Sequence, residues 1–133
     1  MPHPARFDPD DPDLARLREL CLALPGTAEK ISHGRPNFFT RKVFAIYGAT
    51  VKGDHWSTER DRSVQVLPDA DERAALQQDR RFFVPAYTGA AGWLGLDLAV
   101  AAVDWAEVAE LVEASYRNTA AKRLVAELDL RRG

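Results

Sequence analysis

The strongest constraint on the fold is a pair of short runs rich in aromatic and β-branched residues, separated by a two-residue polar step. The runs are Asn37–Thr40 and Val43–Tyr47. Such residues fit the half-buried surface of a sheet, and so short a connection joins antiparallel neighbours. A third run, Ser63–Leu67, alternates polar and apolar residues with the period of two expected for a strand. These runs predict three antiparallel strands in the middle of the chain.

Two helices are predicted on either side of this strand region. Asp11 followed by Pro12 is typical of a helix start, and leucines with Cys21 recur behind it at helical spacing. Asp69 with Glu72 three residues later forms a capping box, which predicts a short helix to about Gln78. That second helix has few large apolar residues, so we expect it at an edge of the sheet.

The C-terminal quarter of the chain carries the clearest helical pattern. Asp104, with Glu107 three residues later, is typical of a helix start. Trp105, Val108, Val112 and Tyr116 follow as an apolar stripe at helical spacing. Apolar residues over 121–128 then predict a final helix. Both helices have an apolar face that needs a partner, and the sheet supplies one.

The segment Phe82–Leu98, FFVPAYTGAAGWLGLDL, combines four aromatic residues, one proline and three glycines. Its alternating leucines in WLGLDL predict a strand with one buried face. Pro85 lacks an amide proton, so the preceding run is short or lies at an edge. Gly89 and Gly92 are expected to turn the chain by adopting backbone angles that other residues disfavour.

These elements together predict an α+β fold. The expected architecture is an antiparallel sheet with an N-terminal helix, in an α-β(3)-α-β(2)-α-like order, with the C-terminal helices packed on the sheet. At 133 residues the chain has the length of one domain, which we place at residues 13–130. Residues 1–12 are proline-rich and acidic, and we expect a loose lead-in there.

Several classes of protein are disfavoured by composition. The longest apolar runs fall far short of a membrane span, and the N-terminus lacks the apolar core of a signal peptide, so we expect a cytoplasmic protein with no membrane partner. The single cysteine, Cys21, excludes an internal disulfide and is expected in the core. His3, His33 and His55 have no metal-ligand spacing, so we expect no metal site and no cofactor.

No catalytic constellation is readable either. The glycines of GAAGWLG precede a strand, whereas a dinucleotide fingerprint follows a strand and opens a helix. No nucleophile stands with a base in a recognisable pattern, so we assign no catalytic residue and expect a non-enzymatic protein.

Charge is distributed unevenly along the chain. Between residues 30 and 62 there are seven basic and three acidic residues, a local balance of +4, although the formal net charge of the whole chain is −2. Between residues 97 and 116 there are five acidic residues and no basic one. Such asymmetry is typical of solvated surface, and it also permits a basic face that attracts phosphates.

A series of short motifs resembles the MmcQ/YjbR family of small bacterial proteins over about residues 14–125. The motifs include LALPGT, His33-Gly34, RFFVPAYTG, Gly92-Trp93 and Asp104-Trp105, and they occur in one order. The resemblance implies an α+β fold with a helix, a three-stranded antiparallel sheet, a helix, further sheet and C-terminal helices. It also implies the "double wing" DNA-binding role that has been proposed for the family from the shape of its fold.

Two functions follow as hypotheses. The first is DNA binding through a basic face near the hairpin and the last helix. Its candidate residues are Arg35, Arg41, Lys42, Lys52, Lys122 and Arg123. The alternative is a small-molecule or protein-interaction module with an apolar pocket near the Gly89–Trp93 turn. Its candidate residues are His33, Trp56, Tyr87 and Trp93.

Overall fold

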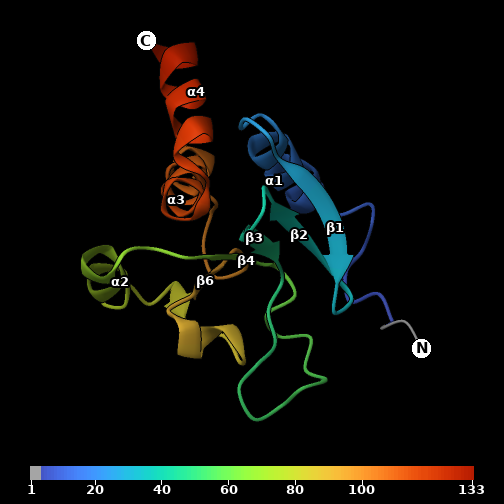
Figure 1. The fold of residues 1–133 in the computed structure, drawn as a ribbon. Coiled ribbons are helices and arrows are strands. Elements are labelled where there is room, and N and C mark those ends of the chain that lie inside the picture. Colours follow the sequence, from blue (N-terminus) through green and yellow to red (C-terminus); the bar gives the residue numbers. More distant parts are fainter. Residues whose placement is uncertain (1–3) are drawn as a thin grey trace.

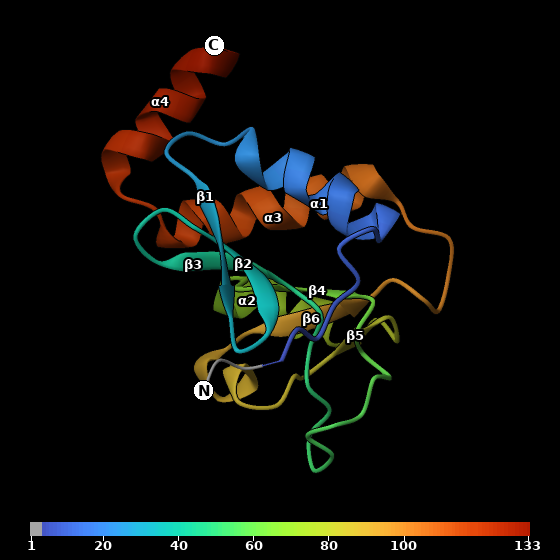
Figure 2. The same cartoon turned by 90° about the vertical axis from the view of Figure 1, so that its right-hand side faces the viewer.

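The computed structural model describes residues 4–133 and shows a sheet with helices on one side (Figures 1 and 2). The elements in chain order are α1 (Pro12–Leu22), β1 (Ala28–Ser32), β2 (Arg35–Phe39), β3 (Val43–Tyr47), β4 (Ser63–Val66), α2 (Ala70–Leu76), β5 (Phe82–Phe83), the 3₁₀ helix η1 (Thr88–Ala91), β6 (Leu94–Asp97), α3 (Trp105–Thr119) and α4 (Lys122–Arg132). The first three residues of the predicted lead-in lie outside the described residues.

The sheet has six strands in the order β1-β2-β3-β4-β6-β5, and every neighbouring pair is antiparallel. This confirms the predicted α+β class. Strand β1 was not predicted, because it is an edge strand with the sequence AEKIS, largely polar and exposed. A two-residue turn joins it to β2, and both turn residues have positive φ, 54° at His33 and 80° at Gly34. Positive φ at both positions is what a tight hairpin turn between twisted strands requires.

The helix-facing side of the sheet is apolar. Phe38, Ala45, Val66 and Leu94 are register partners across four strands, and all four are buried. Helices α1 and α3 lie together over this side, as Figure 2 shows. Helix α4 begins just after α3 and adds Leu124 and Leu128 to the same core.

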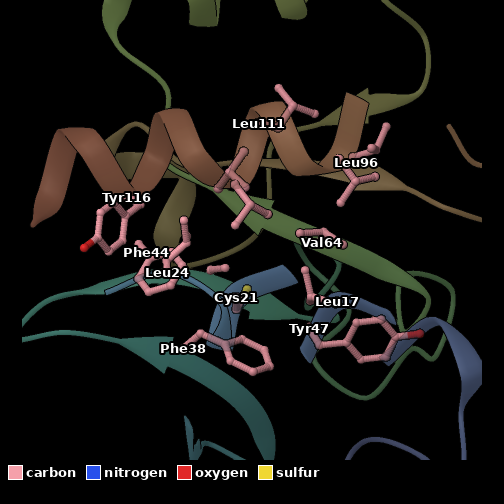
Figure 3. Packing of buried hydrophobic residues seen from close by; sticks show 14 of the residues in the cluster. Leu17, Cys21, Leu24, Phe38, Phe44, Tyr47, Val64, Leu96, Leu111 and Tyr116 are labelled. Carbon is pink, nitrogen blue, oxygen red and sulfur yellow. The ribbon is translucent and has the colours of Figure 1, made fainter. Parts of the chain in front are cut away.

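Aromatic residues dominate the centre of this core (Figure 3). The rings of Phe44 and Tyr116 meet edge to face with centroids 5.4 Å apart, and the Tyr116 hydroxyl donates to the Pro25 carbonyl at 2.7 Å. Cys21 lies among them, fully buried as predicted, and burial raises the pKa of its thiol. A buried thiol of this kind packs as a small apolar side chain and is chemically inert.

Three aspartates cap the predicted helices as expected. Asp11 accepts from the Asp13 amide at 2.9 Å, Asp69 from the Glu72 amide at 2.8 Å, and Asp104 from the amides of Ala106 and Glu107. Each carboxylate satisfies a backbone donor that the first turn of a helix leaves without a partner. Helix α2 contains no buried residue, which agrees with its predicted place outside the core.

The two glycines before β6 act differently from one another. Gly92 has a φ of 99°, so it supplies the backbone freedom that was predicted. Gly89 has no positive φ. A Cβ at Gly89 would instead lie 2.4 Å from Cγ1 of Val84, so this glycine is required by close packing within the turn.

The opposite face of the sheet carries a different row of side chains. Asn37, Ile46, Gln65 and Gly95 are register partners across β2, β3, β4 and β6. Loops cover this face where helices cover the other one, and the long segment between β3 and β4 projects on that side in Figure 2. Within residues 4–133, no helix combines the length and the apolar composition that crossing a bilayer requires.

Ser115 connects α3 to the sheet, and its removal tests this contact. Its buried hydroxyl donates to the Phe44 carbonyl at 2.6 Å and accepts from the Leu67 amide at 2.9 Å. Ser115→Ala leaves both backbone groups without a partner, so we expect the free energy of unfolding to fall by about 2 kcal/mol in urea denaturation. Ser57→Ala, which removes only an exposed hydrogen bond from the Glu59 amide in the β3–β4 loop, is the control, with an expected change within about 0.5 kcal/mol. A Ser115→Ala protein as stable as this control would contradict the role.

Candidate functional site

A cavity of about 380 Å³ lies on the face of the sheet opposite the helices. This volume falls in the range typical of small-molecule sites. Its walls come from the N-terminal segment, the β1–β2 turn, the loop between β3 and β4, and the segment before η1. The lining residues are Pro4, Arg6, Ser32, His33, Arg35, Asn37, Ile46, Thr50, His55, Trp56, Gln65, Ala86, Tyr87 and Thr88.

The floor of the cavity is held rigidly by Gln65. Its side-chain nitrogen donates to the Gly48 carbonyl at 2.8 Å, and its side-chain oxygen accepts from the Thr88 hydroxyl at 2.6 Å. Gln65 thus uses both ends of its amide to join β4 to the end of β3 and to the segment around η1. Asn37 donates to the Arg35 carbonyl at 3.0 Å and completes the polar part of the floor beside Ile46.

Arg35 is the most constrained charged residue of the site. Its side chain is only 5% exposed, and it donates to the carbonyls of Arg6 and Ala49 and to the carboxylate of Asp61, at 3.1 to 3.2 Å. Burial lowers the pKa of the guanidinium; the Asp61 carboxylate opposes that effect, and the positive charge of Arg6 adds to it. A cation with one carboxylate partner is therefore built into the wall.

The N-terminal segment forms a second wall through Arg6. Its amide donates to the Gly34 carbonyl at 2.7 Å, and its guanidinium donates to the Thr50 hydroxyl at 3.1 Å and the His55 carbonyl at 2.6 Å. The same guanidinium lies 5.4 Å from the centre of the Trp56 ring. Arg6 therefore fastens the loop between β3 and β4 over the sheet.

Aromatic residues form the rim. His55 Nδ1 lies 2.9 Å from the Tyr87 hydroxyl, and the His55 ring meets the Trp56 ring edge to face at 4.6 Å. Trp56 and Tyr87 are 68% and 74% exposed, which is unusual for such large rings and leaves them open to a ligand. Tyr87 has a φ of 67°, in a region that residues with side chains disfavour.

The side chains that line the cavity are rich in hydrogen-bond donors. Two arginines and two histidines line it, and no lining residue is acidic. No group of three His, Cys, Asp or Glu side chains within residues 4–133 is placed to hold a metal ion. The arrangement can bind, orient and neutralise a ligand.

The structure brings together three of the four residues predicted for a pocket. His33, Trp56 and Tyr87 line the same cavity, although they come from three separate parts of the chain. Trp93 is half-buried and does not line it. The predicted location near the Gly89–Trp93 turn is correspondingly displaced toward Tyr87 and Thr88, just before the turn.

Sequence reasoning missed the polar floor and the arginine wall. Asn37 and Gln65 are buried, but ordinary alternation along a strand places such polar residues on the solvent side, so the pattern did not indicate that they would be covered. Arg6 and Thr50 carry no signal in the sequence either, because only the folded chain brings them to the sheet.

The six residues predicted for DNA binding are separated by the structure. Arg35 is buried and engaged within the protein, so its guanidinium does not face a duplex. The other five are exposed and lie on the β2–β3 turn (Arg41 and Lys42), the β3–β4 loop (Lys52) and the start of α4 (Lys122 and Arg123). For these five, DNA binding stays a prediction.

Two wider grooves of about 750 Å³ each run along the surface. One lies between the N-terminal segment and α1, and there Arg62 pairs with Asp13 at 2.7 Å. The other lies between α1, α3 and α4, where Arg117 pairs with Glu113 at 3.2 Å. Both grooves are lined by arginines together with acidic residues, whereas the smaller cavity has no acidic residue in its lining.

The fold and site together define an α+β domain with a six-stranded antiparallel sheet that is closed by helices on one face and by loops around a cavity on the other. The family model described as YjbR matches residues 22–118, and the chain belongs to the YjbR family. The predicted resemblance is thereby confirmed.

A solved structure shares this fold. The crystal structure of Deinococcus radiodurans protein DR2400, family-model domain DUF419, superposes with a TM-score of 0.62 at 18% identity, and the match covers 87% of each chain. A comparison of the sequence with curated proteins yields no match.

Arg35 substitutions test how the wall is held. Arg35→Met leaves two carbonyls and Asp61 without their donor, so we expect a loss of about 3 kcal/mol in the free energy of unfolding. Arg35→Lys keeps the charge but cannot reach three acceptors in the planar geometry of a guanidinium, so its loss should be intermediate. Asp61→Asn removes only the ion pair and should cost least. Urea denaturation of the three variants checks the order, and equal losses for all three would contradict it.

Proposed function

We propose that this YjbR-family protein is a non-enzymatic small-molecule-binding domain and that the cavity behind the sheet is its ligand site. One observation carries the proposal. Within residues 4–133, only two non-glycine residues have a positive φ, His33 and Tyr87, and both line this cavity. The β1–β2 hairpin turn accounts for His33, but Tyr87 lies in no hairpin turn. Such a conformation costs on the order of 1–3 kcal/mol and persists where the surroundings enforce it, which is common at binding sites.

Side-chain hydrogen bonds within the protein hold the site in shape. Gln65 and Arg35 hold the floor and one wall through side-chain bonds to four backbone or side-chain partners in the loops. Gly48 permits this packing, because a Cβ there would lie 2.3 Å from Nη1 of Arg35. A preformed cavity lowers the ordering cost that binding has to overcome.

The lining also has the mixture that ligand sites use. Ile46, Trp56 and Tyr87 supply apolar and aromatic surface, while the guanidinium and amide groups supply a few directional donors.

Blocking the cavity tests this proposal. Fragment screening by protein-observed NMR should find compounds that shift the signals of Trp56, Tyr87 and Thr88 saturably. Ala86→Trp places a large ring at the cavity wall and should abolish those shifts. Ala126→Trp, on the exposed surface of α4, is the matched control and should leave them unchanged. Urea denaturation confirms that both variants fold.

The proposal fails if the fragments bind equally well to the Ala86→Trp protein, or if no fragment shifts residues of the cavity.

A second function, DNA binding, is supported by one observation. Five exposed cations predicted for it form no ion pair with another residue in 4–133, whereas four of the eight exposed arginines do form one. The five are Arg41, Lys42, Lys52, Lys122 and Arg123. An unpaired cation on the surface can neutralise a phosphate and release its counterion.

A salt series measures this second function. If DNA is bound, mobility-shift affinity for mixed duplex should fall with rising salt, with a slope of about 0.9 per phosphate contact. Lys122→Gln combined with Arg123→Gln should reduce the slope by up to about 1.8. Arg80→Gln, at an exposed arginine outside the predicted set, should leave it unchanged. No shift at low salt would exclude duplex DNA as the partner.

A further inference from the structure

We propose that the ligand of the cavity is a small molecule with one oxyanion group, a carboxylate or a phosphate, on an apolar or aromatic body. This rests on the proposed function and adds the class of ligand. Two arginines line the cavity and no acid does, so the lining carries a charge that the lining itself does not balance.

Arg35 supplies the buried part of that charge. A guanidinium has five N–H groups. Three hydrogen bonds, to the Arg6 carbonyl, the Ala49 carbonyl and Asp61, are formed by this one. Two N–H groups therefore have no acceptor within residues 4–133. Asp61, its one carboxylate partner, stands outside the cavity lining and is itself 31% exposed.

Arg6 supplies the second charge, and within residues 4–133 no carboxylate pairs with it. Its two guanidinium bonds go to a neutral hydroxyl on Thr50 and a neutral carbonyl on His55. The two arginines also lie close enough to repel each other, since the charge of Arg6 lowers the pKa of Arg35. An anion placed between them would relieve this repulsion and accept the remaining donors.

The apolar and aromatic residues of the lining indicate the shape and polarity of the rest of the ligand. Ile46 forms an apolar patch on the floor, and the exposed rings of Trp56 and Tyr87 stand at the rim. Exposed aromatic rings at the mouth of a cavity favour a flat or apolar group that covers them. The polar end of the ligand then faces the arginines, and its apolar end faces the rings.

Three matched probes separate charge from shape: 2-naphthoate, 2-naphthyl phosphate and the neutral 2-naphthamide. Protein-observed NMR titration should give at least one of the two anions an affinity about tenfold tighter than that of the amide, because charge-assisted hydrogen bonds are roughly twice as strong as neutral ones. The comparison of the two anions identifies the preferred oxyanion. Rising salt should weaken the anions and leave the amide unchanged.

Substitutions assign the effect to the cavity. Arg6→Gln should remove most of the advantage of the anions over the amide. Arg16→Gln is the matched control, because Arg16 also stacks on a tryptophan, Trp105, and does not line the cavity. Asp61→Asn should act in the opposite direction and tighten the anions about threefold, since it removes the competing carboxylate. A structural effect alone would not change sign between Arg6→Gln and Asp61→Asn.

The outcomes distinguish this inference from the proposed function. If the amide binds as tightly as both anions, or if Arg6→Gln leaves the difference unchanged, the ligand class is wrong and the site stands. If only neutral or cationic fragments bind at the cavity, the ligand class is again wrong and the site stands. If neither the probes nor any fragment shifts residues of the cavity, both proposals fail.

Discussion

The buried guanidinium of Arg35 is the interaction on which the loop-covered face of the sheet depends. Arg35 is the first residue of β2. Its guanidinium donates to the carbonyl of Arg6 in the N-terminal segment, to the carbonyl of Ala49 just after β3, and to the carboxylate of Asp61 just before β4. One planar side chain thus holds three segments that are far apart in the sequence. A buried cation is costly unless its donors find acceptors, so these segments are held where the acceptors are needed. The cavity is the space that remains between them.

The two faces of the sheet are shielded from solvent in different ways. One face is apolar, and two amphipathic helices bury it, with Ser115 of α3 adding two hydrogen bonds. The other carries Asn37 and Gln65, whose amides have to be paired before they can be covered. Their partners are the carbonyls of Ser32, Arg35 and Gly48 and the hydroxyl of Thr88, which lie at strand ends and in the segment around η1. The cavity lies among these segments. The Deinococcus radiodurans protein shares this fold.

Features that depend on interactions between residues close in the sequence were predicted, whereas features that depend on distant residues were not. Helix starts at Asp11, Asp69 and Asp104 were predictable because a cap and its target are two or three residues apart. Strand β1 was not predicted, since an exposed edge strand needs no apolar pattern and is defined by its pairing with β2. Gly89 was expected to supply an unusual backbone angle, and packing against Val84 explains it instead. For the site, aromatic residues were chosen from the sequence as candidates, and Trp56 and Tyr87 line the cavity. Trp93 was chosen on the same ground but does not line it.

The sequence by itself determined the α+β class, the positions of the helices and most strands, and the presence of aromatic residues and histidines available to a site. These features follow from periodicity and local hydrogen bonding, which act over a few residues. Only the tertiary structure decided that Arg6, Arg35 and Gln65 meet the aromatic rim around one cavity, and that Arg35 is withdrawn from the surface on which a phosphate backbone would lie. These contacts are hydrogen bonds between residues that lie tens of positions apart in the sequence. They depend on the strand register, which is a property of the whole sheet.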